Sequence, residues 1–352
     1  MCKERILLRH HKLVILLIAS LVLNTSTFAF EKVGTTSFQF LKVMNEARAT
    51  SMGEAYTSVV QNSDAMFWNP GALTEISGTY DISVSYTNWF LDTRHFNFSL
   101  GYKTKRWGTL GLMGLMVDMG YIEETTVSNL GFDNDGVYNP GLTGEKLYIG
   151  AFGLGLAYAR NMTDKFSFGA LLKYVKEDLH YGDASSGIVD IGMLYRTGYR
   201  SIKIAAVVKH FGPEVAFTQQ RDSDLVPYTP DDSSNTITGE GYPLPQTFNM
   251  GISAYLIAPD NSLLFTSTQH SLLVSFDLIH PRDYDQQYGI GLEYGFMDNL
   301  YLRGGYKINY DEEGLCLGFG LKVSNYRIDY SYNDYGEYLG AVNRFSIGML
   351  FP

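Results

Sequence analysis

Apolar and polar residues alternate with a period of two through most of the chain after residue 79. The stretches 80–87, 96–103, 288–295 and 315–322 show the pattern clearly, with an aromatic or aliphatic side chain at every second position. Such alternation predicts β-strands with one apolar and one polar face. Fourteen strands are predicted, near 79–87, 95–103, 107–120, 145–160, 166–181, 186–197, 201–212, 245–258, 270–281, 285–296, 299–310, 314–325, 326–334 and 343–351.

The connections between these strands differ in length according to the side of the membrane on which they are predicted to lie. If the first strand begins on the periplasmic side, the inner connections are short except for 258–269, and the two longest, 121–144 and 211–244, lie outside. Outer-membrane barrels have an even number of strands, short periplasmic turns and long outer loops. The sequence therefore predicts an all-β fold, a 14-stranded antiparallel transmembrane β-barrel over residues 79–352, in contact with outer-membrane lipids. The alternative is a secreted soluble β protein with a one-sided core.

The start of the chain has the pattern of an export signal. Residues 1–12 carry four basic side chains, 13–23 are apolar, and Thr27 and Ala29 are small residues suited to cleavage. An apolar run of this length is too short for a membrane-spanning helix, which takes roughly 20 residues. We expect residues 1–29 to be a secretory signal peptide, the alternative being an uncleaved anchor.

One stretch before the barrel departs from the period of two: "ARATSMGEAYTSVVQNSDAMFWNPGAL", residues 47–73. The spacing of its apolar residues predicts one face of an amphipathic helix, formed by Met52, Ala55, Tyr56, Val59 and Val60. Asp64 is a candidate N-cap for a short turn that follows. Asn69 precedes Pro70, which disfavours the α region, and Gly71 tolerates unusual backbone angles.

A fourteen-stranded barrel is wider than an eight-stranded one, whose side chains alone fill the interior. We therefore expect residues 30–78 to form a helical plug in the lumen. The alternative is a periplasmic cap outside the mouth of the barrel.

The same stretch resembles the N-terminal signature of the PorV/PorQ family, roughly Gly-Ala-Arg-Ala-x-x-Met-Gly-Gly-Ala-Tyr followed by Asp-x-x-Ala-x-x-Trp-Asn-Pro-Ala-Gly-Leu. The signature residues are Arg48, Met52, Gly53, Tyr56, Trp68, Asn69, Pro70 and Gly71. Glu46 stands in place of the first Gly of the pattern, and Gly71-Ala72 inverts the usual Ala-Gly. The closing residues 328–351 also resemble the family's last hairpin. The family is similar to FadL-type barrels, and the resemblance implies fourteen strands with an N-terminal segment folded into the lumen.

The resemblance implies two functions of different classes. PorV-like proteins serve type IX secretion by binding exported cargo, and here the outer loops 121–144 and 211–244 would dock the cargo or secretion-system proteins. FadL-like relatives pass hydrophobic small molecules across the outer membrane, through an apolar pocket between plug and wall. The first is the main interpretation and the second the alternative.

Charge and chemistry exclude other classes. Removal of residues 1–29 leaves 23 basic and 36 acidic side chains, a net charge of −13, which argues against nucleic acid as a partner. No histidine has metal-ligand spacing to another histidine or to Cys316, and no nucleophile elbow is present. The run 133–136 hints at calcium, but Tyr138 and Gly144 occupy the required Gly and Glu positions. We expect no enzyme activity, no metal and no cofactor.

Several charged residues fall on the predicted lumen face. Among them are Glu293, Arg303, Lys307, Lys322 and Asp329. We expect them to pair with one another and with plug residues such as Arg48, the alternative being that some line a conduit. Glycines within the predicted strands are expected to ease curvature.

Overall fold

The computed structural model describes residues 33–132, 136–180, 182–220 and 236–352. The predicted signal peptide, the acidic part of the run at 133–136 and the tip of the predicted loop 211–244 lie outside these residues. Among the described helices, none combines the length and the apolar character needed to cross a membrane.

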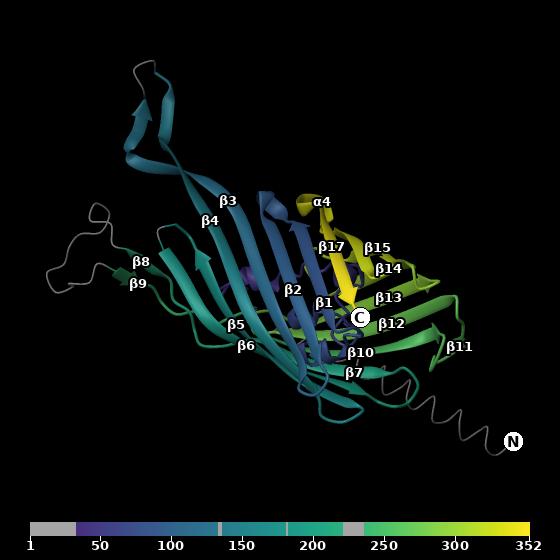
Figure 1. Ribbon diagram of the computed structural model, residues 1–352. Helices are drawn as coiled ribbons and strands as arrows, with labels where there is room; N and C mark the ends of the chain where they lie inside the picture. The colour runs from purple at the N-terminus through teal and green to yellow at the C-terminus, as the bar shows by residue number, and fades with distance from the viewer. Residues whose placement is uncertain (1–32, 133–135, 181, 221–235) are drawn as a thin grey trace. The chain divides into compact units, whose positions relative to one another are not determined.

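Within the described residues, fourteen strands pair into a closed antiparallel ring (Figure 1). They are β1 Tyr80–Asn88, β2 Arg94–Thr104, β3 Gly108–Phe132, β4 Tyr138–Asn161, β5 Phe166–Asp178, β6 Gly182–Arg196, β7 Lys203–Phe211, β10 Thr247–Ala258, β12 His270–Pro281, β13 Gln287–Phe296, β14 Leu300–Ile308, β15 Leu315–Val323, β16 Tyr326–Asp334 and β17 Ala341–Phe351. The predicted barrel is confirmed in class and strand number.

The ring closes because the first and last of these strands pair. Tyr80 of β1 faces Tyr102 of β2 on one side and Phe351 of β17 on the other. Three short strands lie in connections: β8 Thr218–Gln220, β9 Thr236–Thr238 and β11 Phe265–Thr266. We call the end with the connections after β1, β3, β5, β7, β12, β14 and β16 the long-loop end, which faces outward in barrels of this kind, and the opposite end the short-turn end.

The prediction of a loop at 121–144 is wrong for most of this range. β3 and β4 continue through it as a hairpin that extends beyond their neighbours (Figure 1). Tyr121 pairs with Tyr148 and Glu123 with Lys146, after β3 has lost β2 as a partner at Asp118. The period of two is weak there because neither face of the hairpin is buried, so the sequence carries no alternation to detect.

The fourteen paired strands form the wall of the barrel. The wall has an apolar outer face and a polar inner face. Ile252 and Leu302 are 45% and 53% exposed, whereas their neighbours Ser253 and Arg303 are 4% and 6% exposed. A closed barrel leaves no backbone edge unpaired, and an apolar exposed face suits contact with the lipids of a bilayer. The protein is therefore placed in the outer membrane.

Residues 33–78, which we call the N-terminal segment, lie against the inner face of the wall. Their short elements are η1 Gln39–Lys42, α2 Ala47–Ser51, α3 Ala65–Trp68 and η2 Pro70–Glu75. Backbone N–H groups of the segment donate to inward-facing side chains: Ala47 to Ser346 at 2.9 Å, and Thr57 to Asp277 at 2.8 Å. Most of the buried apolar cluster forms between the segment and the wall. Two further elements, η3 Phe90–Asp92 and α4 Gly336–Leu339, lie at the long-loop end.

The predicted amphipathic helix through residue 60 is wrong. The helix α2 ends at Ser51, because Gly53 and Glu54 have φ angles of 62° and 61° and so leave the right-handed helical region. The five apolar residues of the predicted face are nevertheless all buried, in a series of turns. Contact with the wall on several sides, rather than one helical face, buries them.

Asp64 does not act as the predicted cap. It stands at the N-cap position of α3, but its side chain makes no cap hydrogen bond. Instead its carboxylate accepts hydrogen bonds from Asn62 and Ser99, each at 2.9 Å. The side chain thus connects the segment to β2.

Candidate functional site

The signature residues Trp68 to Gly71 form a corner fixed to the wall by Asn69. This residue is extended, with φ −155° and ψ 100°, and its Oδ1 accepts from Gly71 N at 3.0 Å. Its Nδ2 donates to the carbonyls of Thr57 at 3.0 Å and of Met193, on β6, at 3.1 Å. An asparagine serves here because one side chain supplies both an acceptor and two donors.

The two signature glycines are required for close approach to the wall. A Cβ on Gly71 would lie 2.6 Å from the carbonyl oxygen of Gly192, and one on Gly53 would lie 2.8 Å from Tyr306 N. Gly53 also has a positive φ, whereas Gly71, which tolerates unusual angles, does not adopt a positive φ. Wall glycines face both positions, so they make room for the segment as well as shaping the strands.

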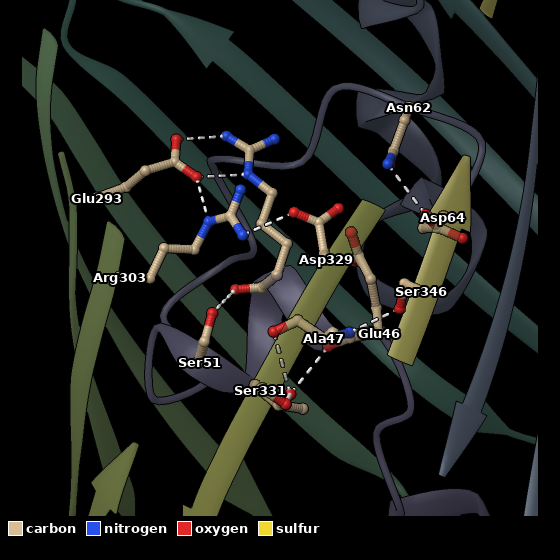
Figure 2. A network of polar contacts seen from close by, with 12 residues as sticks. Glu46, Ala47, Ser51, Asn62, Asp64, Glu293, Arg303, Asp329, Ser331 and Ser346 are labelled. Carbon is tan, nitrogen blue, oxygen red and sulfur yellow. Dashed lines mark hydrogen bonds and ion pairs between the residues drawn. The ribbon is translucent and has the colours of Figure 1, made fainter. Parts of the chain in front are cut away.

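Arg48 joins the N-terminal segment to three of the predicted lumen charges. It donates two 2.8 Å hydrogen bonds to Glu293, which also accepts from Arg303 at 2.6 Å. Arg303 in turn donates to Asp329 at 2.7 Å. Figure 2 shows Glu293, Arg303 and Asp329 side by side on the inner wall. Two cations and two anions alternate, so each charge is paired.

The remaining two predicted lumen charges lie apart from this network. Lys307 contacts Glu54 of the segment at 2.6 Å and also pairs with Glu313. Lys322 pairs with Asp298 at 2.5 Å near the short-turn end, where its side chain is 38% exposed. The structure therefore brings together Glu293, Arg303 and Asp329, but not Lys307 or Lys322.

Two acids of the N-terminal segment are buried with few compensating charges. Burial, together with the nearby Asp64, raises the pKa of Glu46 well above its usual value. Burial and the neighbouring Asp81 raise the pKa of Asp64 to about 6. Glu46 accepts a hydrogen bond from the signature residue Tyr56 at 3.2 Å. Both carboxyl groups favour the neutral form more than free carboxyls do.

A cavity of about 490 Å³ lies at the long-loop end, between the N-terminal segment and the wall. Its apolar lining includes Trp68, Trp89, Phe90, Tyr335 and Leu339, and its charged lining includes Lys42, Glu54, Lys209, Lys307 and three acids at 311–313. A second space of about 40 Å³ also lies between the segment and the wall. The two share Met44, Trp68, Lys209 and His210, so they meet at these residues.

Most residues that line the cavity are not among the functional residues predicted from the sequence. The adjacent aromatics Trp89 and Phe90 lie between two strands, where turn residues are the rule. This departure from the usual composition of a turn is a sequence signal for a functional site. Among the described residues, no group of three or more His, Cys, Asp or Glu side chains could hold a metal ion.

No family model matches the chain. No curated protein matches it either. Among solved structures, the toluene transporter TbuX of Ralstonia pickettii shares the fold at 14% identity and a TM-score of 0.55, over 89% of this chain and 99% of TbuX. A FadL homologue of Pseudomonas aeruginosa is 12% identical with a TM-score of 0.52, over 88% and 98% of the two chains.

The toluene transporter TodX of Pseudomonas putida is 12% identical with a TM-score of 0.50, over 92% of this chain and 98% of TodX. At these identities the likeness concerns the fold. The chain thus has the architecture of FadL-like outer-membrane barrels.

Proposed function

We propose that the protein carries hydrophobic small molecules across the outer membrane. The observation that carries this proposal is the cavity of about 490 Å³ with aromatic residues at the long-loop end. Pockets of a few hundred Å³ with mainly apolar walls and a few polar groups are typical small-molecule sites. The similar folds of two toluene transporters support the same function.

Uptake by cells tests this proposal. Cells that contain the protein should take up at least one radiolabelled hydrophobic compound, from toluene to a long-chain fatty acid, faster than cells without it. Phe90→Asp introduces a charge into the cavity wall and should reduce this uptake severalfold. Leu91→Asp is the matched control, since Leu91 is 94% exposed and lies outside the cavity lining.

Equal uptake with and without the protein, for every compound, would refute the proposal. Equal uptake by the Phe90→Asp and wild-type proteins would exclude this cavity as the route.

In this function the N-terminal segment, within residues 30–78, acts as a plug that narrows the lumen. The charge pairs of the segment residues Arg48 and Glu54 with the wall residues Glu293 and Lys307 support this role, which stays a prediction. The ionic conductance of the protein in a planar lipid bilayer tests whether the segment blocks the lumen. A plugged barrel should show a far smaller conductance than an open pore of fourteen strands.

A second candidate is the binding of exported cargo or secretion-system proteins, as the PorV/PorQ resemblance implies. One observation favours it: the extended hairpin of β3 and β4 exposes apolar side chains, including Val127 at 83% and Phe132 at 75%. Exposed apolar groups of this kind mark interaction surfaces. Recovery of co-purifying proteins from cells should fall when residues 121–148 are replaced by a two-residue turn, and unchanged recovery would exclude the hairpin as a docking site.

A further inference from the structure

Three neighbouring turns at the short-turn end of the barrel carry exposed basic side chains. The turns are residues 105–107 between β2 and β3, 162–165 between β4 and β5, and 197–202 between β6 and β7. Their exposed bases, together with the one near the end of β4, form what we call the basic rim: Lys105, Arg106, Arg160, Lys165 and Arg200. The remaining connections at this end, 259–269, 297–299 and 324–325, contain two acids and no Lys or Arg. The basic rim therefore occupies one side of the ring.

The three turns lie side by side, so the bases form one continuous arc. The Tyr158 hydroxyl, on β4, donates to the carbonyl of Trp107 at 2.6 Å. The backbone N of Arg196, at the end of β6, donates to the carbonyl of Lys165 at 2.7 Å. A Cβ on Gly198 would lie 2.5 Å from Lys165 Nζ, so this ammonium group reaches over the turn between β6 and β7.

The basic rim lacks acidic partners within the chain. Among the described residues, no carboxylate oxygen lies within 4.0 Å of a nitrogen of its five side chains. By contrast, Arg196 and Lys203, from the adjoining strand ends, both pair with Glu75. Acids are not scarce, since the chain has 37 acidic and 27 basic side chains. Clustered like charges repel one another, and anions from outside the chain would offset this repulsion.

Aromatic side chains place the basic rim at the depth of the lipid headgroups. Trp107 is 71% exposed, and the Arg106 guanidinium carbon lies 6.0 Å from the centre of its ring. Tyr158, Tyr195 and Tyr199 are also exposed at the short-turn end. Exposed Trp and Tyr side chains of a barrel gather where the membrane meets water. The bases beside them therefore lie at the level of the phosphate groups in the periplasmic leaflet.

We propose that the basic rim binds the phosphate groups of anionic phospholipids in the periplasmic leaflet. Phosphate oxygens accept charge-assisted hydrogen bonds from Lys and Arg, and a row of headgroups supplies negative charge along the whole arc. An acidic protein segment would also complement the charge, but the depth set by Trp107 favours lipid. This inference is independent of the proposed transport function, because it concerns the outer face of the wall.

Trp107 reports directly on the lipid beside the basic rim. Trp68 is 2% exposed and Trp89 lines the cavity, so Trp107 is the tryptophan that faces lipid. The full-length protein is reconstituted at low salt in liposomes that mix phosphatidylcholine with phosphatidylglycerol, one of the two brominated near the glycerol end of its acyl chains. Bromine quenches tryptophan fluorescence on contact. Quenching by each brominated lipid in turn should show phosphatidylglycerol about fivefold enriched around Trp107.

A matched pair of double variants makes the test specific. Lys105→Gln/Arg160→Gln removes two charges of the basic rim and should reduce the enrichment to about twofold or less. Arg94→Gln/Lys146→Gln removes the same charges from exposed positions at the long-loop end and should behave as wild type. Lys105→Arg/Arg160→Lys keeps the charge and should keep the enrichment. Heat-dependent migration in gels checks that each variant forms the barrel.

Salt provides a test that needs no variant. Raising the NaCl concentration should weaken the enrichment around the wild-type protein, because these exposed charges are screened. Equal quenching by the two brominated lipids in the wild type would overturn the inference. So would an unchanged enrichment in Lys105→Gln/Arg160→Gln, or an equal loss in Arg94→Gln/Lys146→Gln, which would show an effect of net charge alone.

Discussion

Arg48 illustrates how a single side chain joins the N-terminal segment to the wall. Its guanidinium meets the Glu293 carboxylate through two parallel hydrogen bonds, a geometry that lysine cannot reproduce. Glu293 is in turn held by Arg303. Each carboxylate oxygen of Glu293 has a cationic donor, and this pairing makes the burial of the charges tolerable.

Asp64 is expected to make the stability of the protein depend on pH. Its pKa is raised to about 6 in the folded state, against about 4 in the unfolded chain. The folded protein therefore binds more protons than the unfolded chain between these values, and its unfolding free energy falls as the pH rises from about 4 to about 6. Asp64→Asn removes this contribution, so the variant should gain stability relative to wild type over that interval.

Urea unfolding in detergent micelles, followed by tryptophan fluorescence at a series of pH values, measures this difference. Asp92→Asn is the matched control, since Asp92 is an exposed acid in η3. Parallel stability profiles for wild type and Asp64→Asn would contradict the assignment.

At the scale of elements, the inward-facing glycines of the wall set the path of the N-terminal segment. Glycines on β13 and β14 meet the backbone at 52–55, and those on β5 and β6 meet the corner at 69–71. In each case a wall side chain would occupy the space that the segment backbone fills. Glycines in barrel strands predict curvature equally well, so the sequence alone could not indicate this second role.

The adjacent pair Gly304 and Gly305 on β14 tests this packing. A Cβ on Gly305 would lie 2.8 Å from Gly53 Cα and closer still to other backbone atoms, whereas one on Gly304 would find its nearest neighbour, Leu317, at 4.0 Å. We expect Gly305→Ala to lower the unfolding free energy by about 1–3 kcal/mol through overpacking. Gly304→Ala should leave it unchanged or raise it by up to about 1 kcal/mol. Urea unfolding of both variants measures the contrast, and equal effects would refute close packing at Gly305.

At the scale of the whole molecule, the sequence predicted the wall well and the interior poorly. The period of two identified fourteen strands because each strand has lipid on one face and polar contacts on the other. The interior lacks such a repeating environment. The end of α2 at Ser51 and the β-bulge at Lys209 and His210 of β7 depend on contacts between segments that are far apart in the chain, and no local sequence pattern encodes such contacts.

A fixed N-terminal segment has a testable consequence for transport. The hydroxyls of Thr50 in α2 and Ser331 in β16 lie 2.8 Å apart, so cysteines at these positions are placed to form a disulfide. In a Cys316→Ser background, the oxidised Thr50→Cys/Ser331→Cys protein should take up substrate at the wild-type rate, because no residue of α2 lines the cavity. Radiolabelled uptake before and after reduction measures this. A rate that is low when oxidised and restored by reduction would show that α2 must move.

The strand β17 contacts both the N-terminal segment and the first strand of the ring. Arg344 donates to the Met44 carbonyl at 2.8 Å, and Ser346 accepts from Ala47 N at 2.9 Å. The same strand closes the ring by pairing with β1. One strand therefore both closes the ring and anchors the N-terminal segment, so a change that displaces β17 would disturb the wall and the interior together.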